Sequence, residues 1–275
     1  MRSAPNPMSS ASLRRELSAR NVARAAEHDH DLSYGTVPSV IYAAESSGHG
    51  NFLAASYRRI TADPQWSARL QKAYTADEWV PRAQDRRRSE LDCAASSDAL
   101  LMNVFCYPGL LRRSGVCALL GIEPGWRPEF GVRAGLPMRK DEVDRTEIDM
   151  RVGDLLVEAK LTETGFGRAS RERVLRYDGV AETFDLEALP WGSAGLAGYQ
   201  LVRGVLAAQH HNARFLLLCD GRRADLHDTW LRVLGAVRSY DLRSRMGLLT
   251  WQELASVTPP VVQRFLGQKY GILVR

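Results

Sequence analysis

Four charged residues whose types suit metal or acid–base chemistry lie close together in the segment TEIDMRVGDLLVEAKLTE: Glu147, Asp149, Glu158 and Lys160. Residues 146–152 alternate between polar and apolar, which predicts a strand with two different faces. Gly153 and Asp154 are typical of a two-residue hairpin turn, and residues 155–161 predict a second strand. The segment is therefore predicted to form a β-hairpin.

The turn length fixes which residues of the predicted hairpin face each other. A two-residue turn places Val152 opposite Leu155. Counting outward then places Asp149 opposite Glu158, and all four charged side chains share one side of the hairpin. The other side of the hairpin is apolar, so we expect it to pack against a hydrophobic core. It carries Ile148, Met150, Val152, Leu155, Val157, Ala159 and Leu161.

Two carboxylates directly across a strand pair lie about 4.5–5.5 Å apart at Cβ and destabilise it. A divalent cation between Asp149 and Glu158 would offset that repulsion, and Mg²⁺ often takes only one or two protein carboxylates. Lys160 would then orient or deprotonate a water, or neutralise charge on a phosphate. The alternative is a solvated hairpin face with a Glu147–Lys160 ion pair and no metal.

The elements around this hairpin predict a mixed sheet flanked by helices. Residues 63–74 and 96–108 predict helices, the second carrying Asp98 and Asn103 within an apolar run. Residues 192–211 predict a long helix that contains Gln200 and Arg203. The further expectations are a buried strand over 214–220, a helix over 225–237, a strand over 247–251 and two closing helices. This order favours an α/β or α+β sandwich with a small mixed central sheet.

The composition is that of a soluble globular protein: 275 residues, 45% hydrophobic and 25% charged. The four cysteines show no CxxC spacing, which indicates buried free thiols in a reducing compartment. No apolar run approaches the ~20 residues of a membrane span, and the first residues lack a secretory signal core, so a cytoplasmic location is expected. A net charge of +5 leans mildly toward anionic partners.

Two segments of the chain are rich in arginine. Residues 1–35 predict a basic extension, partly flexible or helical, and residues 36–275 a single domain with its catalytic core at about 90–240. After the hairpin, GFGRASRERVLRY supplies four arginines that would suit a nucleic-acid backbone: Arg168, Arg171, Arg173 and Arg176. Ordinary helix charge patterning is the alternative explanation for this second segment.

The segments SSDALLMNVFCYPG, RTEIDMRVGDLLVEAKLTE and YQLVRGVLAA, taken in this order, resemble the PD-(D/E)XK nuclease superfamily. They are most similar to a restriction-endonuclease-like group of uncharacterised bacterial proteins, over roughly residues 48–272. The resemblance implies that Asp149 and Glu158 bind metal and that Lys160 is the catalytic lysine. Ile148 stands where the superfamily name has proline.

The resemblance also implies supporting roles for residues around this triad. Glu147 would be an additional ligand or would tether Lys160, and Asp98 or Asn103 would complete the outer shell. Gln200 matches a polar helix residue near the site of related enzymes.

The implied activity is cleavage of DNA with Mg²⁺, or Mn²⁺ as a substitute, in defence or repair. A homodimer would suit double-strand cutting, although no segment indicates an interface. Two other classes stay open: a catalytically silent nucleic-acid-binding module on the same fold, and an enzyme acting on a small phosphorylated substrate. No P-loop or Rossmann glycine pattern supports the last class.

Overall fold

The computed structural model describes residues 7–33, 37–46, 48–72 and 89–274. Packing divides the chain into two compact units, one comprising mainly residues 8–128 and 251–275 and the other mainly residues 129–250. Within the described residues, no helix combines the length and the apolar character that crossing a membrane requires. All four cysteines are described, and each is buried outside any disulfide, which confirms the prediction of buried thiols.

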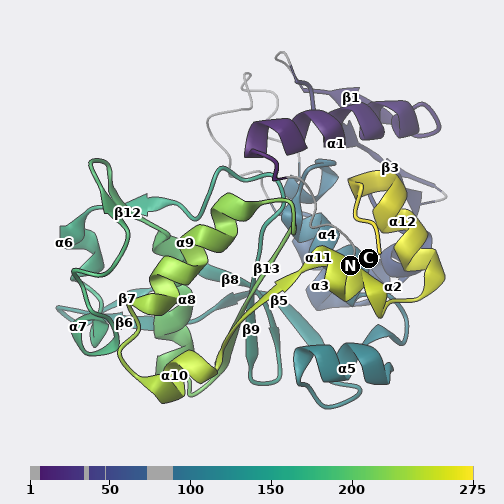
Figure 1. The fold of residues 1–275 in the computed structure, drawn as a ribbon. Coiled ribbons are helices and arrows are strands. Elements are labelled where there is room, and N and C mark those ends of the chain that lie inside the picture. The colour runs from purple at the N-terminus through teal and green to yellow at the C-terminus, as the bar shows by residue number, and fades with distance from the viewer. Residues whose placement is uncertain (1–6, 34–36, 47, 73–88, 275) are drawn as a thin grey trace, which may run out of the picture. The chain divides into compact units, whose positions relative to one another are not determined.

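The second unit is built on a five-stranded mixed sheet, which confirms the predicted fold class (Figure 1). Its strand order is β14-β13-β9-β8-β5, that is Met246–Thr250, Arg214–Cys219, Leu155–Ala159, Glu147–Val152 and Pro128–Arg133. β8 and β9 are antiparallel, whereas β13 runs parallel to both β9 and β14. β9 therefore lies in the interior of the sheet, and all its residues are buried.

Helix α8, Tyr199–His210, packs on β9 and β13 of this sheet. Its contact with the sheet is close at Gly204, where a Cβ atom would lie 2.2 Å from Cε2 of Phe215. α9, Ala224–Gly235, packs beside α8 and contributes the fully buried Trp230 to the same core. α10, Tyr240–Ser244, lies against β14.

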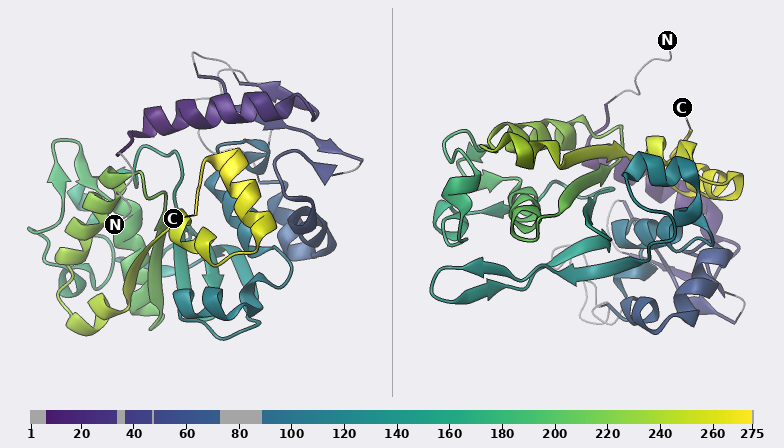
Figure 2. Two further views of the ribbon diagram at one scale, coloured as in Figure 1. Left: turned by 45° about the vertical axis from the view of Figure 1, so that its right-hand side comes forward. Right: turned by 90° about the horizontal axis from the view of Figure 1, so that it is seen from below.

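Smaller elements complete the second unit. β6, Leu136–Met138, and β7, Glu142–Asp144, form a hairpin that extends away from the five strands in the right-hand view of Figure 2. Short helices α6, Arg171–Val174, and α7, Val180–Thr183, follow β10, Arg168–Ala169. β10 pairs with β12, Gly195–Ala197, which also pairs with β11, Trp191–Gly192.

The helix predicted over 192–211 is wrong in its first part. Residues 191–197 form β11 and β12, and the helix begins only at Tyr199. The glycines explain the difference, because Gly195 has φ 97° and Gly198 has φ 89°, outside the helical region. Gly195 also approaches the Ala169 carbonyl oxygen so closely that a Cβ atom would lie 2.3 Å from it.

The first unit is mainly helical. It contains α2, Ala54–Ala62, α3, Pro64–Arg69, α4, Ser97–Phe105, α5, Ser114–Leu120, and α11, Trp251–Ser256. Four short strands lie between α1 and α2 in the chain: β1, His30–Leu32, β2, Val40–Tyr42, β3, Ala44–Glu45, and β4, Gly48–His49. The Asp63 carboxylate caps the N-terminus of α3, and the Ser96 hydroxyl caps that of α4.

Part of the predicted basic extension is an ordered helix in this unit. α1, Ser10–Ala25, packs against α12, Pro260–Tyr270. One face of α1 is buried at every fourth position: Leu13, Leu17, Asn21 and Ala25. Asn21 joins the two helices, because its side chain bonds the Lys269 carbonyl at 3.2 Å and the Lys269 ammonium at 2.9 Å. The boundary between an extension and a single nuclease domain stays a prediction.

Candidate functional site

The hairpin of β8 and β9 has the predicted turn and register near the turn. Val152 faces Leu155 and Met150 faces Val157 across Gly153 and Asp154. Beyond Met150 the Asp149 carboxylate accepts a hydrogen bond from the Ala159 amide at 2.7 Å. The end of the hairpin therefore carries a side-chain acceptor that joins the two strands.

Glu158 and Lys160 project from the interior strand of the sheet. Two residues apart on an extended chain, they point to the same side, and the Lys160 amide extends the pairing by donating to the Leu218 carbonyl at 2.9 Å. Both side chains are only 6% exposed. The part of the hairpin face that carries Glu158 and Lys160 is therefore not solvated. The alternative of a metal-free face with a Glu147–Lys160 ion pair otherwise stays a prediction.

The Lys160 ammonium lies 2.7 Å from Oε1 of Glu158, in a buried ion pair on one strand. Burial lowers the pKa of Lys160, but the carboxylates of Glu158, Asp149 and Glu163 together raise it above its usual value. Lys160 is therefore a cation at neutral pH in this state. This charge favours orienting or electrostatic roles over removal of a proton from water.

The residues at the hairpin end have the donor chemistry that Mg²⁺ prefers. Asp149 and Glu158 supply carboxylate oxygens, one side chain partly exposed and the other buried. The Ala159 amide donates to Asp149 of β8. The amide and the carbonyl of an extended residue point to the same neighbouring strand, so the Ala159 carbonyl also faces β8. In the described part of the chain, no group of three or more His, Cys, Asp and Glu residues has the arrangement of a metal site. Two carboxylates and a carbonyl still fit an ion that keeps several waters.

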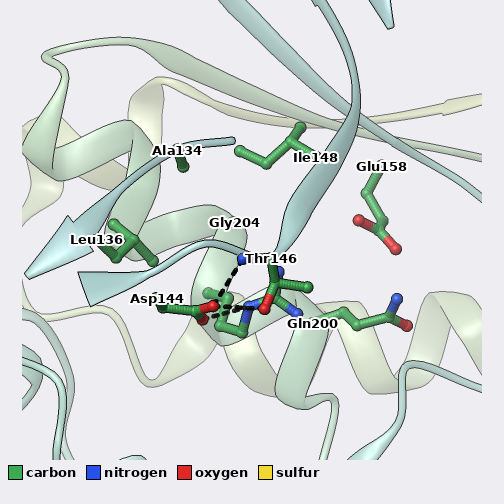
Figure 3. A pocket seen from close by; sticks show the side chains of 9 residues that line it. Ala134, Leu136, Asp144, Thr146, Ile148, Glu158, Gln200 and Gly204 are labelled. Carbon is green, nitrogen blue, oxygen red and sulfur yellow. Dashed lines mark hydrogen bonds and ion pairs between the residues drawn. The ribbon is translucent and has the colours of Figure 1, made fainter. Parts of the chain in front are cut away.

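Glu158 also lines a small cavity together with Gln200 of α8, and the two side chains project toward the same space (Figure 3). Asp144, Thr146 and Arg203 line the same cavity. The predicted proximity of Gln200 to an acidic residue of the triad is therefore seen in the structure, whereas its role stays a prediction.

Asp144 and Arg203 form a polar cluster that sequence reasoning did not identify. Nε of Arg203 lies 3.1 Å from the Asp144 carboxylate, which also accepts from Thr146 and, at 2.5 Å, from the Tyr177 hydroxyl. The Tyr177 hydroxyl lies 2.6 Å from that of Tyr199. Burial raises the pKa of Asp144, but these hydrogen bonds and the Arg203 charge lower it overall, so Asp144 is an anion.

The other predicted supporting residues have different surroundings. Glu147 begins β8, and its carbonyl accepts from Arg203 at 3.4 Å. Asp98 and Asn103 belong to α4 of the first unit. Asp98 pairs there with Arg69 at 3.1 Å and Lys72 at 2.9 Å.

The Asn103 side chain joins α4 to the segment before α2. Its Nδ2 donates to the Asn51 carbonyl at 3.0 Å and to the Ala99 carbonyl at 2.8 Å, while its Oδ1 accepts from the Leu53 amide at 2.6 Å. These contacts give Asn103 a structural role within the first unit. An outer-shell role of Asp98 or Asn103 at a metal stays a prediction.

The four arginines after the hairpin are all exposed on the second unit. Arg171 pairs with Glu187 and lies over the Trp191 ring, 5.4 Å from its centroid. Arg176 pairs with Glu142. Arg173 lies over the Tyr199 ring at 5.0 Å. Arg168 belongs to strand β10, Arg171 and Arg173 belong to the four-residue helix α6, and Arg176 lies in the turn that follows it, so no continuous helix presents these side chains.

The five-stranded mixed sheet with flanking helices is consistent with a restriction-endonuclease-like fold. A family described as restriction endonuclease associating with ARP matches residues 20–271, and the chain belongs to this family. Membership indicates a nuclease-like function and an interaction with DNA. No curated protein and no solved structure matches the chain.

Proposed function

We propose that this protein is a metal-dependent deoxyribonuclease whose PD-(D/E)XK site consists of Asp149, Glu158 and Lys160. The observation that carries the proposal is the buried Glu158–Lys160 ion pair, 2.7 Å long, in the electrostatic field of Asp149 at the hairpin end. A buried ion pair is expensive to desolvate and is weak evidence for stability alone. Its placement beside a second carboxylate, in a restriction endonuclease family, supports a catalytic role.

Each residue has a distinct part in this proposal. Asp149, Glu158 and the Ala159 carbonyl would hold Mg²⁺, or Mn²⁺ in its place, and the ion would supply Lewis-acid polarisation of the phosphodiester. Lys160, as a fixed cation, orients the attacking water and stabilises the negative charge that develops on the phosphate. Gln200 lines the same cavity as Glu158 and would keep its carboxylate in position.

The exposed arginines of the second unit would hold the DNA backbone beside this site. Arg168 and Arg173 are exposed, and neither guanidinium pairs with a carboxylate of the residues that the structure describes. Contacts of this kind release counterions, so binding to long DNA would weaken steeply with salt. A small phosphorylated substrate would not show this steep dependence. Assembly as a homodimer and a role in defence or repair stay predictions.

The test is cleavage of linear, supercoiled and single-stranded DNA with Mg²⁺ or Mn²⁺ by the wild type, Lys160→Ala and Asp149→Ala. Asp154→Asn is the matched control, since Asp154 lies in the turn of the same hairpin and pairs with Arg214 at 2.8 Å. We expect metal-dependent cutting by the wild type and the control, and loss of cutting in the other two variants. DNA binding without any cutting would favour the silent binding module, and cutting by both site variants would place the active site elsewhere.

A further inference from the structure

A groove lies between the β6–β7 hairpin and helix α6, in the part of the second unit labelled at the left of Figure 1. The two walls are joined by backbone hydrogen bonds at the base, from the Arg139 amide to the Arg176 carbonyl at 2.8 Å and from the Asp178 amide to the Pro137 carbonyl at 3.2 Å. Backbones joined in this way lie about 5 Å apart. Hydrogen-bonded backbones leave no opening between them, so these two segments close the floor of the groove.

Arg173 is held on one wall of this groove in a fixed position. Its guanidinium lies over the Tyr199 ring, 5.0 Å from the centroid, and the Tyr199 hydroxyl is fixed by that of Tyr177 at 2.6 Å. Both tyrosines are buried, whereas Arg173 is exposed and lines the groove. One face of the guanidinium is thus covered by a ring, and the remaining face is available to a planar ligand.

The charges along the groove are mixed. Its cationic side chains are Arg145, Arg173 and Arg176, and its acidic ones are Glu142, Asp144 and Glu172. A surface for phosphates alone would be uniformly basic. Glu142 pairs with Arg176 and Asp144 pairs with Arg203. The side chains left to match the edges of a nucleobase are therefore Arg145, Arg173 and Glu172, and arginine and carboxylate side chains recognise such edges. Bases of unpaired strands also stack on guanidinium planes.

The groove adjoins the proposed active site. Asp144 lines both the groove and the cavity that contains Glu158 and Gln200. We propose that the groove binds an unpaired nucleobase of the substrate strand, stacked on Arg173 and held at its edge by the acidic and basic side chains of the walls. The inference rests on the proposed function, since it assumes that the substrate is a nucleic acid, and it names the substrate class: DNA with an unpaired segment beside the cleavage position.

The test is binding measured by fluorescence anisotropy in EDTA, so that no cleavage takes place. The probes are a fully paired duplex and the same duplex with a single-stranded tail. Arg173→Lys keeps the positive charge but removes the planar group. Arg243→Lys is the control, because Arg243 is an exposed arginine of α10 that does not line the groove.

We expect the wild type and Arg243→Lys to bind the tailed DNA more tightly than the duplex. Arg173→Lys should bind the tailed DNA at least about fivefold more weakly, with duplex binding and its salt dependence unchanged. Equal binding of the two probes by the wild type, or a wild-type preference retained by Arg173→Lys, would overturn the inference. Neither result would bear on cleavage by the Asp149 and Lys160 variants, so the proposed active site is tested separately.

Discussion

Replacement of Lys160 by methionine tests whether the ion pair at the centre of the site is truly buried. Lys160→Met keeps most of the side-chain volume but removes the ammonium that lies 2.7 Å from Glu158. Removing one partner of a buried ion pair costs about 3–5 kcal/mol, because the other charge stays in a poorly solvated place. For a chain of this size the melting temperature should fall by roughly 6–20 °C.

The double variant Glu158→Gln/Lys160→Met separates this cost from lost packing. It removes both charges, so we expect it to be more stable than Lys160→Met alone. The assay is thermal unfolding followed by circular dichroism in EDTA. If Lys160→Met melts at the wild-type temperature, the reasoning is refuted, because the Lys160 ammonium must then be solvated in the wild type.

The pH dependence of this effect has a definite sign. The pKa of Lys160 is raised above its usual value of 10.5, since the neighbouring carboxylates outweigh the effect of burial. A group with a raised pKa in the folded state contributes stability that is complete below the unfolded value and is lost as the pH rises through the folded value. The stability difference between the wild type and Lys160→Met should therefore be constant near neutral pH and shrink only above about pH 10.5.

Three further predictions concern the metal, the sheet and the first unit. Mg²⁺ at one hundred times its Kd should stabilise the folded wild type by about 2.7 kcal/mol and so raise its melting temperature. The same Mg²⁺ concentration should leave the melting temperature of Asp149→Asn unchanged. Gly204→Ala should destabilise the protein by about 1–3 kcal/mol in urea unfolding, because its Cβ would meet the Phe215 ring; Gly235→Ala, which meets no atom within 4 Å, should be neutral or stabilising. Burial and the nearby Arg24 charge lower the pKa of Lys269, so the stability of the wild type relative to Lys269→Met should rise as the pH approaches 10.5 from below; a flat difference would contradict this.

Features set by local residue patterns could be predicted from the sequence. The turn at Gly153 and Asp154 determines the register near it, and the apolar run of 214–219 indicates an interior strand. The Ser96 cap of α4 follows from the residue type and its position before an apolar run. These features require only neighbours in the chain.

The partner of Lys160 could not be predicted by counting across the hairpin. Counting assumes that the backbones of the two strands stay paired from the turn to Glu147 and Lys160. In the structure, however, the Ala159 amide donates to the Asp149 carboxylate and not to a backbone carbonyl of β8. Lys160 pairs with Glu158 on its own strand, in surroundings created by the later strand β13. The sequence held the relevant signal, since residues two apart on a strand share a side.

The Asp144 cluster depends on residues brought together only by the tertiary fold. Arg203 comes from α8, whereas Tyr177 follows α6, and both reach Asp144 at the end of the β6–β7 hairpin. One local signal was present: the Asp144 carboxylate accepts from the Thr146 amide two residues later, a turn that aspartate commonly forms. The strands at 191–197 were missed because a glycine-rich stretch before an apolar helix gives no alternating pattern.

The most direct test of the account is single-turnover cleavage of end-labelled DNA by the wild type and Asp149→Asn with Mg²⁺. Asparagine keeps the size of the side chain and its acceptor for the Ala159 amide, but it lacks the negative charge that would hold a cation. The account predicts metal-dependent cleavage by the wild type and none by Asp149→Asn when both proteins melt at similar temperatures. Equal cleavage by the two proteins would contradict the assignment of the hairpin as the active site.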